Sequence, residues 1–491
     1  MMESSNHVVI LYPSPGIGHL VSMVELGKRI NTHHPSLSVI ILIIPAPYET
    51  GSTDKYIATV SSATTPSITF HHLPLIPLPP DLMISSEFID LAFEIPQLYN
   101  PLVHNTLAAI SQKSPIKAVV LDFFSNAAFQ VSKSSLDLPT YYFYTSGASG
   151  LCAFLYLPTI HKTTSKSLKD LDLFFHIPGV PPVHSSHFPT PMFHRETKTY
   201  KNFITTATNM AKSSGIIANS FLELEERAAE ALRGGKCVTD GPTPPIYLIG
   251  PLIASGNNNQ VDHNDEENEC LKWLETQPSK SVVFLCFGSM GVFKKEQLTE
   301  IAVGLERSGH RFLWVVRKPP SDGNESSSSG GRKLEFDLDD ILPQGFLART
   351  REKGLVVKNW APQPSILSHD SVGGFVSHCG WNSSLEAVVS GVPMVAWPLY
   401  AEQKMNRVYL VEEMKVALPL KTLMSAAAAA ADGFVSAEAV EETVRQLMEG
   451  EEGRVVRERI LEMSGRAKAT VDVGGSSRLD FLKLTRSWTQ Q

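Results

Sequence analysis

Residues 8–30 read VVILYPSPGIGHLVSMVELGKRI, an apolar run followed by a turn rich in glycine and proline and then by a helical pattern. Residues 282–306, VVFLCFGSMGVFKKEQLTEIAVGLE, repeat this order of apolar run, glycine turn and helix. Short apolar runs that alternate with amphipathic helices indicate parallel strands buried on both faces. The two segments therefore predict two doubly wound α/β units, one in each half of the chain.

The rest of the chain supports two domains, because 491 residues exceed the roughly 250–300 that one hydrophobic core usually serves. Further apolar runs of strand length occur at 39–44, 118–124 and 140–144 in the first half, and at 311–316, 354–360, 373–378 and 392–398 in the second. We expect a first domain over residues 1–251, a polar linker over 252–270, a second domain over 271–470, and a C-terminal helix over 471–491.

Composition excludes several classes of protein. The net charge of −7 argues against binding of a nucleic-acid backbone, which needs a basic face. No stretch reaches the roughly 20 apolar residues of a membrane span, and the N-terminus lacks the basic start of a signal peptide. The five cysteines are scattered without a CxxC pair, which favours neither a disulfide framework nor a zinc site. We therefore expect a cytoplasmic protein that has no membrane span and does not bind nucleic acid, and we also expect it to be a monomer.

Two side chains at the ends of predicted strands suggest acid–base chemistry. His19 follows the first strand, and Asp122 ends the apolar part of the run 118–124, where an unpaired carboxylate would be costly. A hydrogen bond from the His19 ring would satisfy this carboxylate and stabilise the imidazolium formed when the ring takes up a proton. The alternative is that Asp122 caps a helix from within its loop.

Residues 360–403 read WAPQPSILSHDSVGGFVSHCGWNSSLEAVVSGVPMVAWPLYAEQ. The indole of Trp360 offers a flat face for a base, and Gln363 and Glu386 offer polar ends for ribose hydroxyls. His378 offers a ring that can become cationic, just before a helix whose first N–H groups attract phosphate. Together these residue types predict a site for a nucleoside diphosphate that carries a hexose.

The same stretch closely resembles, over its full length and without a gap, the signature box of plant secondary-product glycosyltransferases, which use UDP-sugars. The resemblance implies the GT-B fold, in which two Rossmann-like domains face each other and the active site lies in the cleft between them. It also implies that the C-terminal helix packs back on the first domain and that His19 and Asp122 form the catalytic dyad.

The expected contacts with the donor combine the residue chemistry with this resemblance. The residues expected to bind UDP are Ser289, Trp360, Ala361, Gln363, His378, Trp381, Asn382, Ser383 and Glu386. The residues expected to bind the sugar are Thr145, Trp381, Glu402 and Gln403. In the resembled family a final glutamine is associated with glucose, and flavonoid glucuronosyltransferases tend to carry arginine where this chain has Trp381. UDP-glucose is therefore the expected donor, although Glu402 stands where many relatives carry aspartate.

The expected reaction needs no cofactor and no metal. A base on one side of the anomeric carbon and a leaving-group site on the other require in-line displacement, so the product should have inverted configuration. Charged His378 and backbone dipoles should neutralise the departing phosphates. Asp170 and Asp172, like Asp337 and Asp339, have the DxD spacing of manganese-dependent glycosyltransferases, but neither pair ends an apolar strand. We interpret both pairs as solvated charge, the first in a polar helical stretch and the second in a loop.

The acceptor is expected to be a phenol of the flavonoid or chalcone type. Aromatic and aliphatic residues of the first domain at 76–82, 88–98, 123–124, 141–144 and 188–193 would form its walls. Attachment to carbon, a sterol or other lipophilic acceptor, and a non-catalytic UDP-sugar sensor are the alternatives. An NAD-linked oxidoreductase is disfavoured, because Val21 stands where the third glycine of its fingerprint is needed.

Overall fold

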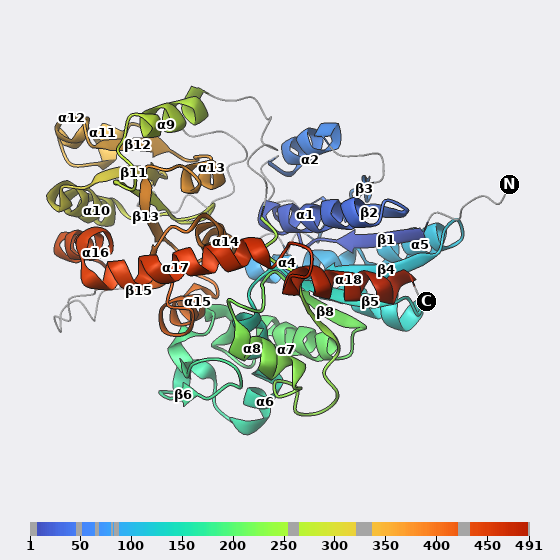
Figure 1. Cartoon of the computed structure of the whole chain (residues 1–491). Helices are drawn as coiled ribbons and strands as arrows, with labels where there is room; N and C mark the ends of the chain where they lie inside the picture. Colours follow the sequence, from blue (N-terminus) through green and yellow to red (C-terminus); the bar gives the residue numbers. More distant parts are fainter. Residues whose placement is uncertain are drawn as a thin grey trace. The chain divides into compact units, whose positions relative to one another are not determined.

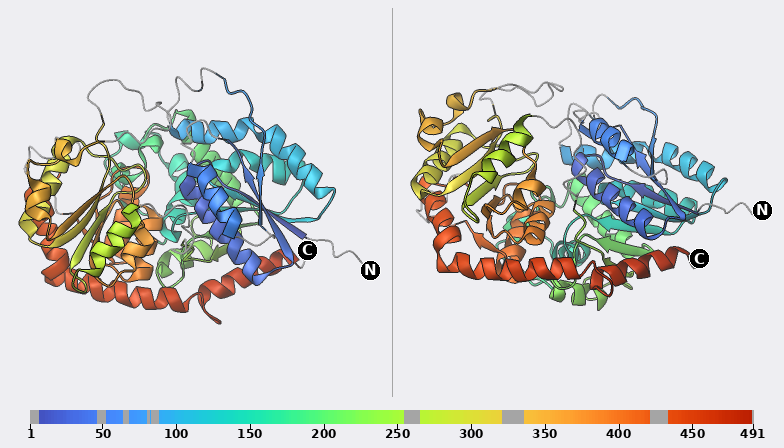
Figure 2. Two further views of the ribbon diagram at one scale, coloured as in Figure 1. Left: turned by 90° about the horizontal axis from the view of Figure 1, so that it is seen from above. Right: turned by 45° about the horizontal axis from the view of Figure 1, so that its top comes forward.

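The computed structural model describes residues 7–45, 52–63, 68–79, 82, 88–253, 265–320, 336–420 and 433–489. The chain forms two compact units, one made of residues 1–254 with 469–491 and the other of residues 255–468 (Figure 1). Each unit contains a parallel β-sheet with helices packed against it, as the two views of Figure 2 show. The predicted α/β class with two doubly wound sheets is confirmed.

The first unit contains a seven-stranded sheet in the order β3-β2-β1-β4-β5-β8-β9. Its strands are β1 (His7–Tyr12), β2 (Leu37–Ile43), β3 (Ile68–His72), β4 (Ile116–Asp122), β5 (Thr140–Tyr144), β8 (Gly215–Ala218) and β9 (Ile246–Leu248). All neighbouring strands run parallel. The chain adds β2 and β3 on one side of β1 and then adds β4, β5, β8 and β9 on the other side. The direction in which strands are added, here called the winding, therefore reverses between β1 and β4.

Helices cover this sheet because their apolar stripes pack on its buried side chains. The helices are α1 (Ile17–His33), α2 (Ser52–Ala63), α4 (Phe88–Leu98), α5 (Asn100–Ser111), α6 (Ala148–Thr163), α7 (Lys198–Ala211), α8 (Glu226–Arg233) and α18 (Ser476–Thr489). Short 3₁₀ helices and the antiparallel pair β6 (Phe174–Phe175) and β7 (Val183–His184) complete the unit. Helix α1 begins after Gly16, whose φ of 122° favours glycine and lets the chain turn sharply from β1 into the helix.

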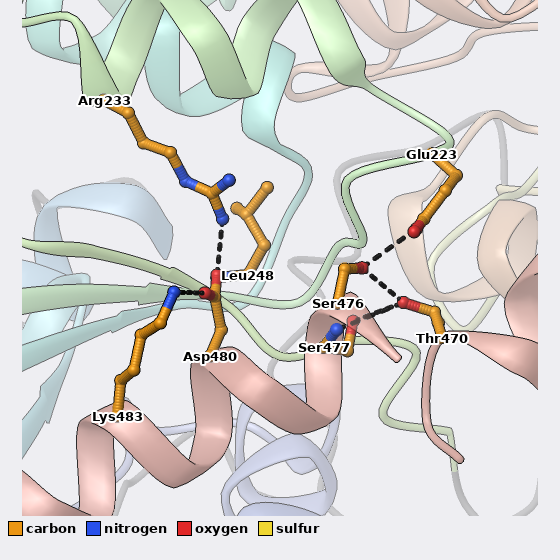
Figure 3. Close-up of polar contacts among 8 residues, drawn as sticks. All are labelled: Glu223, Arg233, Leu248, Thr470, Ser476, Ser477, Asp480 and Lys483. Carbon is orange, nitrogen blue, oxygen red and sulfur yellow. Dashed lines mark hydrogen bonds and ion pairs between the residues drawn. The ribbon is translucent and has the colours of Figure 1, made fainter. Parts of the chain in front are cut away.

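The C-terminal helix α18 belongs to the first unit although the second unit precedes it in the chain. Phe481, Leu484 and Trp488 are fully buried in the hydrophobic core that also contains the central strands. The carboxylate of Asp480 accepts hydrogen bonds from the Leu248 backbone N–H at 3.0 Å and from the Arg233 guanidinium at 2.5 Å (Figure 3). These contacts attach the end of the chain to β9 and α8.

The second unit contains a six-stranded parallel sheet in the order β12-β11-β10-β13-β14-β15. Its strands are β10 (Val282–Cys286), β11 (Arg311–Val316), β12 (Gly354–Lys358), β13 (Val372–Ser377), β14 (Met394–Ala396) and β15 (Ala417–Pro419). Its helices are α9 (Asp265–Glu275), α10 (Lys295–Ser308), α11 (Leu338–Ile341), α12 (Phe346–Thr350), α13 (Gln363–Leu367), α14 (Trp381–Ser390), α15 (Gln403–Val408), α16 (Ala437–Glu449) and α17 (Glu451–Ala469). Here the winding reverses between β10 and β13.

Some elements differ from the sequence-based prediction. Strand β4 ends at Asp122, and the aromatic residues expected to continue it begin a 3₁₀ helix. Residues 265–270 of the expected linker form the start of α9. Residues 254–264 and 321–335 of the two polar stretches lie outside the described residues. Within the described part of the chain, no helix is long and apolar enough to cross a membrane.

Candidate active site

The reversal of winding in the first unit brings two chemically important turns together. Tyr12 of β1 lies beside Leu121 of β4 in the parallel register, so the carboxyl ends of these strands are neighbours. In doubly wound sheets, ligands bind beyond the carboxyl ends of the strands at such a reversal. The turn and helix start after β1 carry His19, and Asp122 is the last residue of β4.

His19 and Asp122 contact each other at this point. Nδ1 of His19 lies 3.0 Å from Oδ2 of Asp122, whose side chain is fully buried, while the His19 side chain is 31% exposed. A carboxylate accepts hydrogen bonds, so the His19 Nδ1–H donates and Nε2 carries the lone pair that can take up a proton. The geometry is that of a general base oriented by a carboxylate.

Aromatic side chains gather next to the His19 ring. Phe124 meets this ring edge to face, with 5.6 Å between the ring centroids. Further ring contacts extend the cluster through α4, β5, α6 and α7, and the residues concerned are Phe93, Phe123, Tyr144, Phe154 and Phe203. Phe93, Phe154 and Phe203 are buried, so the partly exposed members Phe123, Phe124 and Tyr144 supply the flat apolar surface near His19.

The other segments expected to form acceptor walls are placed differently. Phe188 packs against Phe175, 5.5 Å away between centroids, rather than against the aromatic cluster. Residues 80 and 81 of the segment 76–82 lie outside the described residues. Thr145 follows β5 and is partly buried, two positions beyond Phe143, the strand partner of Asp122. Thr145 therefore lies at the same edge of the sheet as the histidine–aspartate pair.

The reversal of winding in the second unit brings the turn after β10 next to the end of β13. Cys286 lies beside Ser377 in the register, so Gly288 and His378 follow neighbouring strand ends. A side-chain carbon on Gly288 would lie 2.6 Å from His378 Nε2, and one on Gly380 would lie 2.4 Å from it. Both positions therefore require glycine because the histidine ring fills the space. Ser289, in the same turn, is exposed.

The structure corrects the expectation that His378 carries a positive charge. Its side chain is only 6% exposed, and burial lowers its pKa to about 4, against a smaller opposite effect from the Cys286 backbone. The ring is therefore neutral at physiological pH. Its buried Nδ1 has no hydrogen-bond partner among the described residues.

Gln363, Ser383 and Glu386 form one hydrogen-bonded group. Nε2 of Gln363 donates to Ser383 Oγ at 2.8 Å and to Glu386 Oε2 at 2.7 Å. Burial raises the pKa of Glu386 to about 7, and the bond from Gln363 only partly opposes this effect.

Trp360, three positions before Gln363, is 47% exposed although it is a large apolar residue, whereas Ala361 is buried. An exposed indole next to polar groups suits the stacking of a base.

The helix α14 begins directly after the turn that contains His378. Its N-cap residue is Gly380, whose lack of a side chain leaves the first turn without a side-chain cap. The turn is held by Asn406, whose Nδ2 donates to the Cys379 carbonyl at 3.0 Å. Asn382 and Ser383 lie in the first turn of the helix, where backbone N–H groups favour an anion. Trp381 is only 5% exposed and packs into the second unit.

Glu402 and Gln403 lie at the start of α15. Oε1 of Gln403 accepts from the backbone N–H groups of Leu399 and Tyr400, both at 2.9 Å, and the side chain is 3% exposed. Glu402 is partly exposed, and its Oε1 lies 3.4 Å from Asn406 Nδ2. The oxygen of the Gln403 amide therefore holds the loop before the helix.

Residues 245–449 match the family described as UDP-glucoronosyl and UDP-glucosyl transferase. The chain is 76% identical over 490 residues to UDP-glycosyltransferase 88B1 of Stevia rebaudiana, and the match covers 100% of each protein. The chain belongs to the plant UDP-glycosyltransferases. Anthocyanidin 5,3-O-glucosyltransferase of a Rosa hybrid cultivar is 49% identical over 496 residues, which cover 98% of this chain and 99% of the relative.

A solved structure supports the fold of this glycosyltransferase. Phytolacca americana UGT2 complexed with UDP-2fluoro-glucose and pterostilbene matches with a TM-score of 0.84 at 33% identity, covering 98% of this chain and 99% of that one. The expected GT-B fold is confirmed, and the protein is a glycosyltransferase enzyme.

The two DxD pairs of the glycosyltransferase lie on its surface. Asp172 forms an ion pair with His184 at 3.0 Å and follows a short 3₁₀ helix that contains Asp170. Asp337 caps α11 by accepting from the Asp339 backbone N–H at 3.1 Å, so this pair lies at a helix start rather than in a loop. All four residues are exposed, in agreement with their interpretation as solvated charge.

Sequence reasoning overlooked two residues of these sites. Ser14, in the turn after β1, donates to Asp122 Oδ1 at 2.6 Å. Arg317 follows β11, and its Nε donates to the Gly288 carbonyl at 3.1 Å, which holds the turn that contains Ser289. The signal for Arg317 was a cation at the carboxyl end of an apolar strand. The proline-flanked turn that contains Ser14 gave no comparable signal, because its partner is distant in sequence.

Proposed function

We propose that this enzyme transfers glucose from UDP-glucose to a phenolic hydroxyl of a flavonoid- or chalcone-type acceptor, with inversion at the anomeric carbon. The proposal rests mainly on the contact between His19 and the buried Asp122, which lie where the winding reverses in the first sheet. The aromatic cluster next to His19 supports a flat aromatic acceptor. Anthocyanidin and pterostilbene, in the descriptions of two relatives, agree with this chemistry.

The proposed base explains how a phenol can attack at neutral pH. A phenol has a pKa of about 10 and histidine one of about 6.5, so complete deprotonation before attack would cost roughly 5 kcal/mol. Proton transfer to His19 Nε2 while the oxygen attacks the anomeric carbon avoids the free phenolate. Asp122 then stabilises the imidazolium through its bond to Nδ1, which already exists in the free protein.

The proposed donor site is the reversal of winding in the second sheet. The exposed Trp360 ring would stack on uracil, and the Gln363–Glu386 pair would bind the ribose hydroxyls. The start of α14 and Nδ1 of His378 would face the diphosphate, which would supply the partner that this buried atom lacks. Because His378 is neutral in the free protein, backbone dipoles rather than a fixed cation provide the main attraction.

Transfer requires both sites, because the first unit supplies the proposed base and the second unit supplies the proposed donor site. In-line displacement requires the base and the departing diphosphate on opposite sides of the anomeric carbon. This arrangement leads to inverted configuration, and the α-linked glucose of the donor becomes a β-glucoside.

Product analysis tests the proposal. The enzyme is incubated with UDP-glucose and a panel of flavonoids, chalcones and sterols, and the products are examined by mass spectrometry and by the anomeric proton coupling in NMR. We expect β-O-glucosides of the phenolic acceptors. A glucose attached to carbon, turnover of sterols alone, or UDP binding without any turnover would each replace the proposal with one of its alternatives.

A further inference from the structure

Ser14 lies directly against the carboxylate that orients the proposed base. It follows Pro13 in the turn after β1 and is 2% exposed. Its Oγ donates to Asp122 Oδ1 at 2.6 Å and accepts from the Phe124 backbone N–H at 2.9 Å. Because the backbone N–H can only donate, the hydroxyl proton is directed to the carboxylate.

The two oxygens of Asp122 are therefore held by different partners. Oδ1 accepts from Ser14 and Oδ2 accepts from the His19 ring. Without the hydroxyl, the buried Oδ1 would lose its donor, and the carboxylate would be less restricted in rotation about its χ2 angle. Either change would alter the direction of the bond that Oδ2 makes with His19.

The turn that carries Ser14 is fixed independently of this bond. Prolines on both sides restrict the backbone, since each proline ring sets its own φ and limits the residue before it. Ser125 Oγ also donates to the Pro13 carbonyl at 3.1 Å, which ties the turn after β1 to the segment after β4. The flanking prolines and the bond from the Phe124 N–H therefore hold the Ser14 hydroxyl in place without a contribution from Asp122 or from the Ser125 side chain.

We propose that Ser14 is a positioning residue of the glycosyl transfer, which acts through Asp122 by fixing the carboxylate that orients His19. This inference rests on the proposed function of His19 and Asp122. Ser14 does not need to touch either substrate. It would extend the histidine–aspartate pair to a hydrogen-bonded chain of three side chains from two adjacent strand ends.

The chain offers a matched control in Ser125. This serine is also fully buried and also joins the two turns, but it bonds to a backbone carbonyl and not to Asp122. We compare Ser14→Ala, Ser14→Thr and Ser125→Ala for kcat, for KM with UDP-glucose and for melting temperature. Threonine retains the hydroxyl, and Ser14 lines a cavity together with Leu20, Ile43 and Ile44.

We expect Ser14→Ala to lower kcat roughly tenfold, as loss of one hydrogen bond to a charged group does, while KM for UDP-glucose stays within about twofold. Ser14→Thr should restore most of kcat. Ser125→Ala should lower the melting temperature as Ser14→Ala does and keep kcat near that of the parent enzyme. In an Asp122→Asn background, Ser14→Ala should cost much less than tenfold, because the charge that the hydroxyl orients is absent.

Equal kcat values for Ser14→Ala and Ser125→Ala, or an undiminished tenfold effect in the Asp122→Asn background, would overturn the inference. If Ser14→Ala does not fold, Ser14→Cys replaces it, since the thiol keeps the volume but is a weak donor, and a kcat equal to that of the parent would again refute the role. Failure of the proposed function has a different signature: His19→Ala and Asp122→Asn would then both retain parental activity.

Discussion

Nδ1 of His19 lies 3.0 Å from Oδ2 of Asp122, although 103 positions separate the two residues in the chain. The contact exists because β1 and β4 are neighbours in the sheet and end at the same edge. Asp122→Asn keeps the side-chain volume but removes the charge that stabilises the imidazolium, so kcat should fall by roughly ten- to a hundredfold, the effect of losing one hydrogen bond to a charged group, while UDP affinity is retained. Steady-state kinetics together with calorimetry of UDP binding measure both quantities, and a variant as active as the parent would make Asp122 a structural residue.

Glu386 should make UDP binding depend on pH. The pKa of its carboxyl is about 7 in the free protein, because burial disfavours the charged form. The ionised carboxylate accepts hydrogen bonds from ribose hydroxyls at both oxygens, whereas the protonated form loses part of this capacity. Affinity should therefore be nearly full at pH 8 and should fall by up to about tenfold between pH 8 and pH 6.

The control for this effect is Glu386→Gln, which cannot ionise at that position. Calorimetry with UDP alone avoids the separate titration of the proposed base. The variant should bind UDP weakly and with a flatter pH dependence, and a parent enzyme whose affinity does not change between pH 8 and pH 6 would contradict the assignment.

Gln403 should contribute to donor recognition through its NH₂ group alone, since its oxygen already accepts from Leu399 and Tyr400. Gln403→Glu retains an acceptor for these backbone groups but loses the NH₂, so kcat/KM for UDP-glucose should fall about tenfold with a small change in melting temperature. Gln403→Ala should lower both kcat/KM and melting temperature.

The parent should prefer UDP-glucose to UDP-galactose and UDP-glucuronate, and a preference for UDP-glucuronate would refute the interpretation of Trp381.

Chelation should leave turnover unchanged. The two DxD pairs are exposed and are engaged in an ion pair and a helix cap rather than placed at the carboxyl ends of the central strands. Turnover is compared in EDTA and after addition of excess manganese. A large loss in EDTA that manganese restores would show that phosphate neutralisation by backbone dipoles is insufficient.

Asp480 should stabilise the first unit through the attachment of α18 (Figure 3). Asp480→Ala leaves the buried Leu248 N–H without its acceptor, which typically costs about 1–3 kcal/mol. The ion pair with Arg233 adds less, because the arginine side chain is 38% exposed. Denaturant unfolding measures the loss, and an unchanged midpoint would mean that burial of Phe481, Leu484 and Trp488 alone holds the helix.

The sequence allowed the main strands of both sheets to be predicted, because fully buried parallel strands leave continuous apolar runs. It did not reveal β3, where the segment ITFHH is mostly exposed, or the three- and four-residue strands β8, β9 and β15. Short or half-exposed strands are defined by their neighbours in the sheet rather than by their own pattern.

The predicted site residues lie at or after the carboxyl ends of parallel strands in the two sheets, but their environments depended on packing. The neutral state of His378 follows from burial between Gly288 and Gly380, which residue spacing does not show. The contact between Ser14 and Asp122 requires knowledge that β1 and β4 are adjacent. The use of the Gln403 oxygen by two backbone groups depends on the conformation of the preceding loop.

If His19 removes the acceptor proton, His19→Ala should lose most of the turnover of a phenolic acceptor. Turnover of a phenolic acceptor is measured at saturating UDP-glucose, together with UDP affinity by calorimetry and melting temperature as a check on folding. We expect kcat to fall by about a hundredfold to ten-thousandfold, the usual contribution of a positioned general base, while UDP affinity stays within about twofold. A folded His19→Ala enzyme that retains the turnover of the parent would contradict this role of His19.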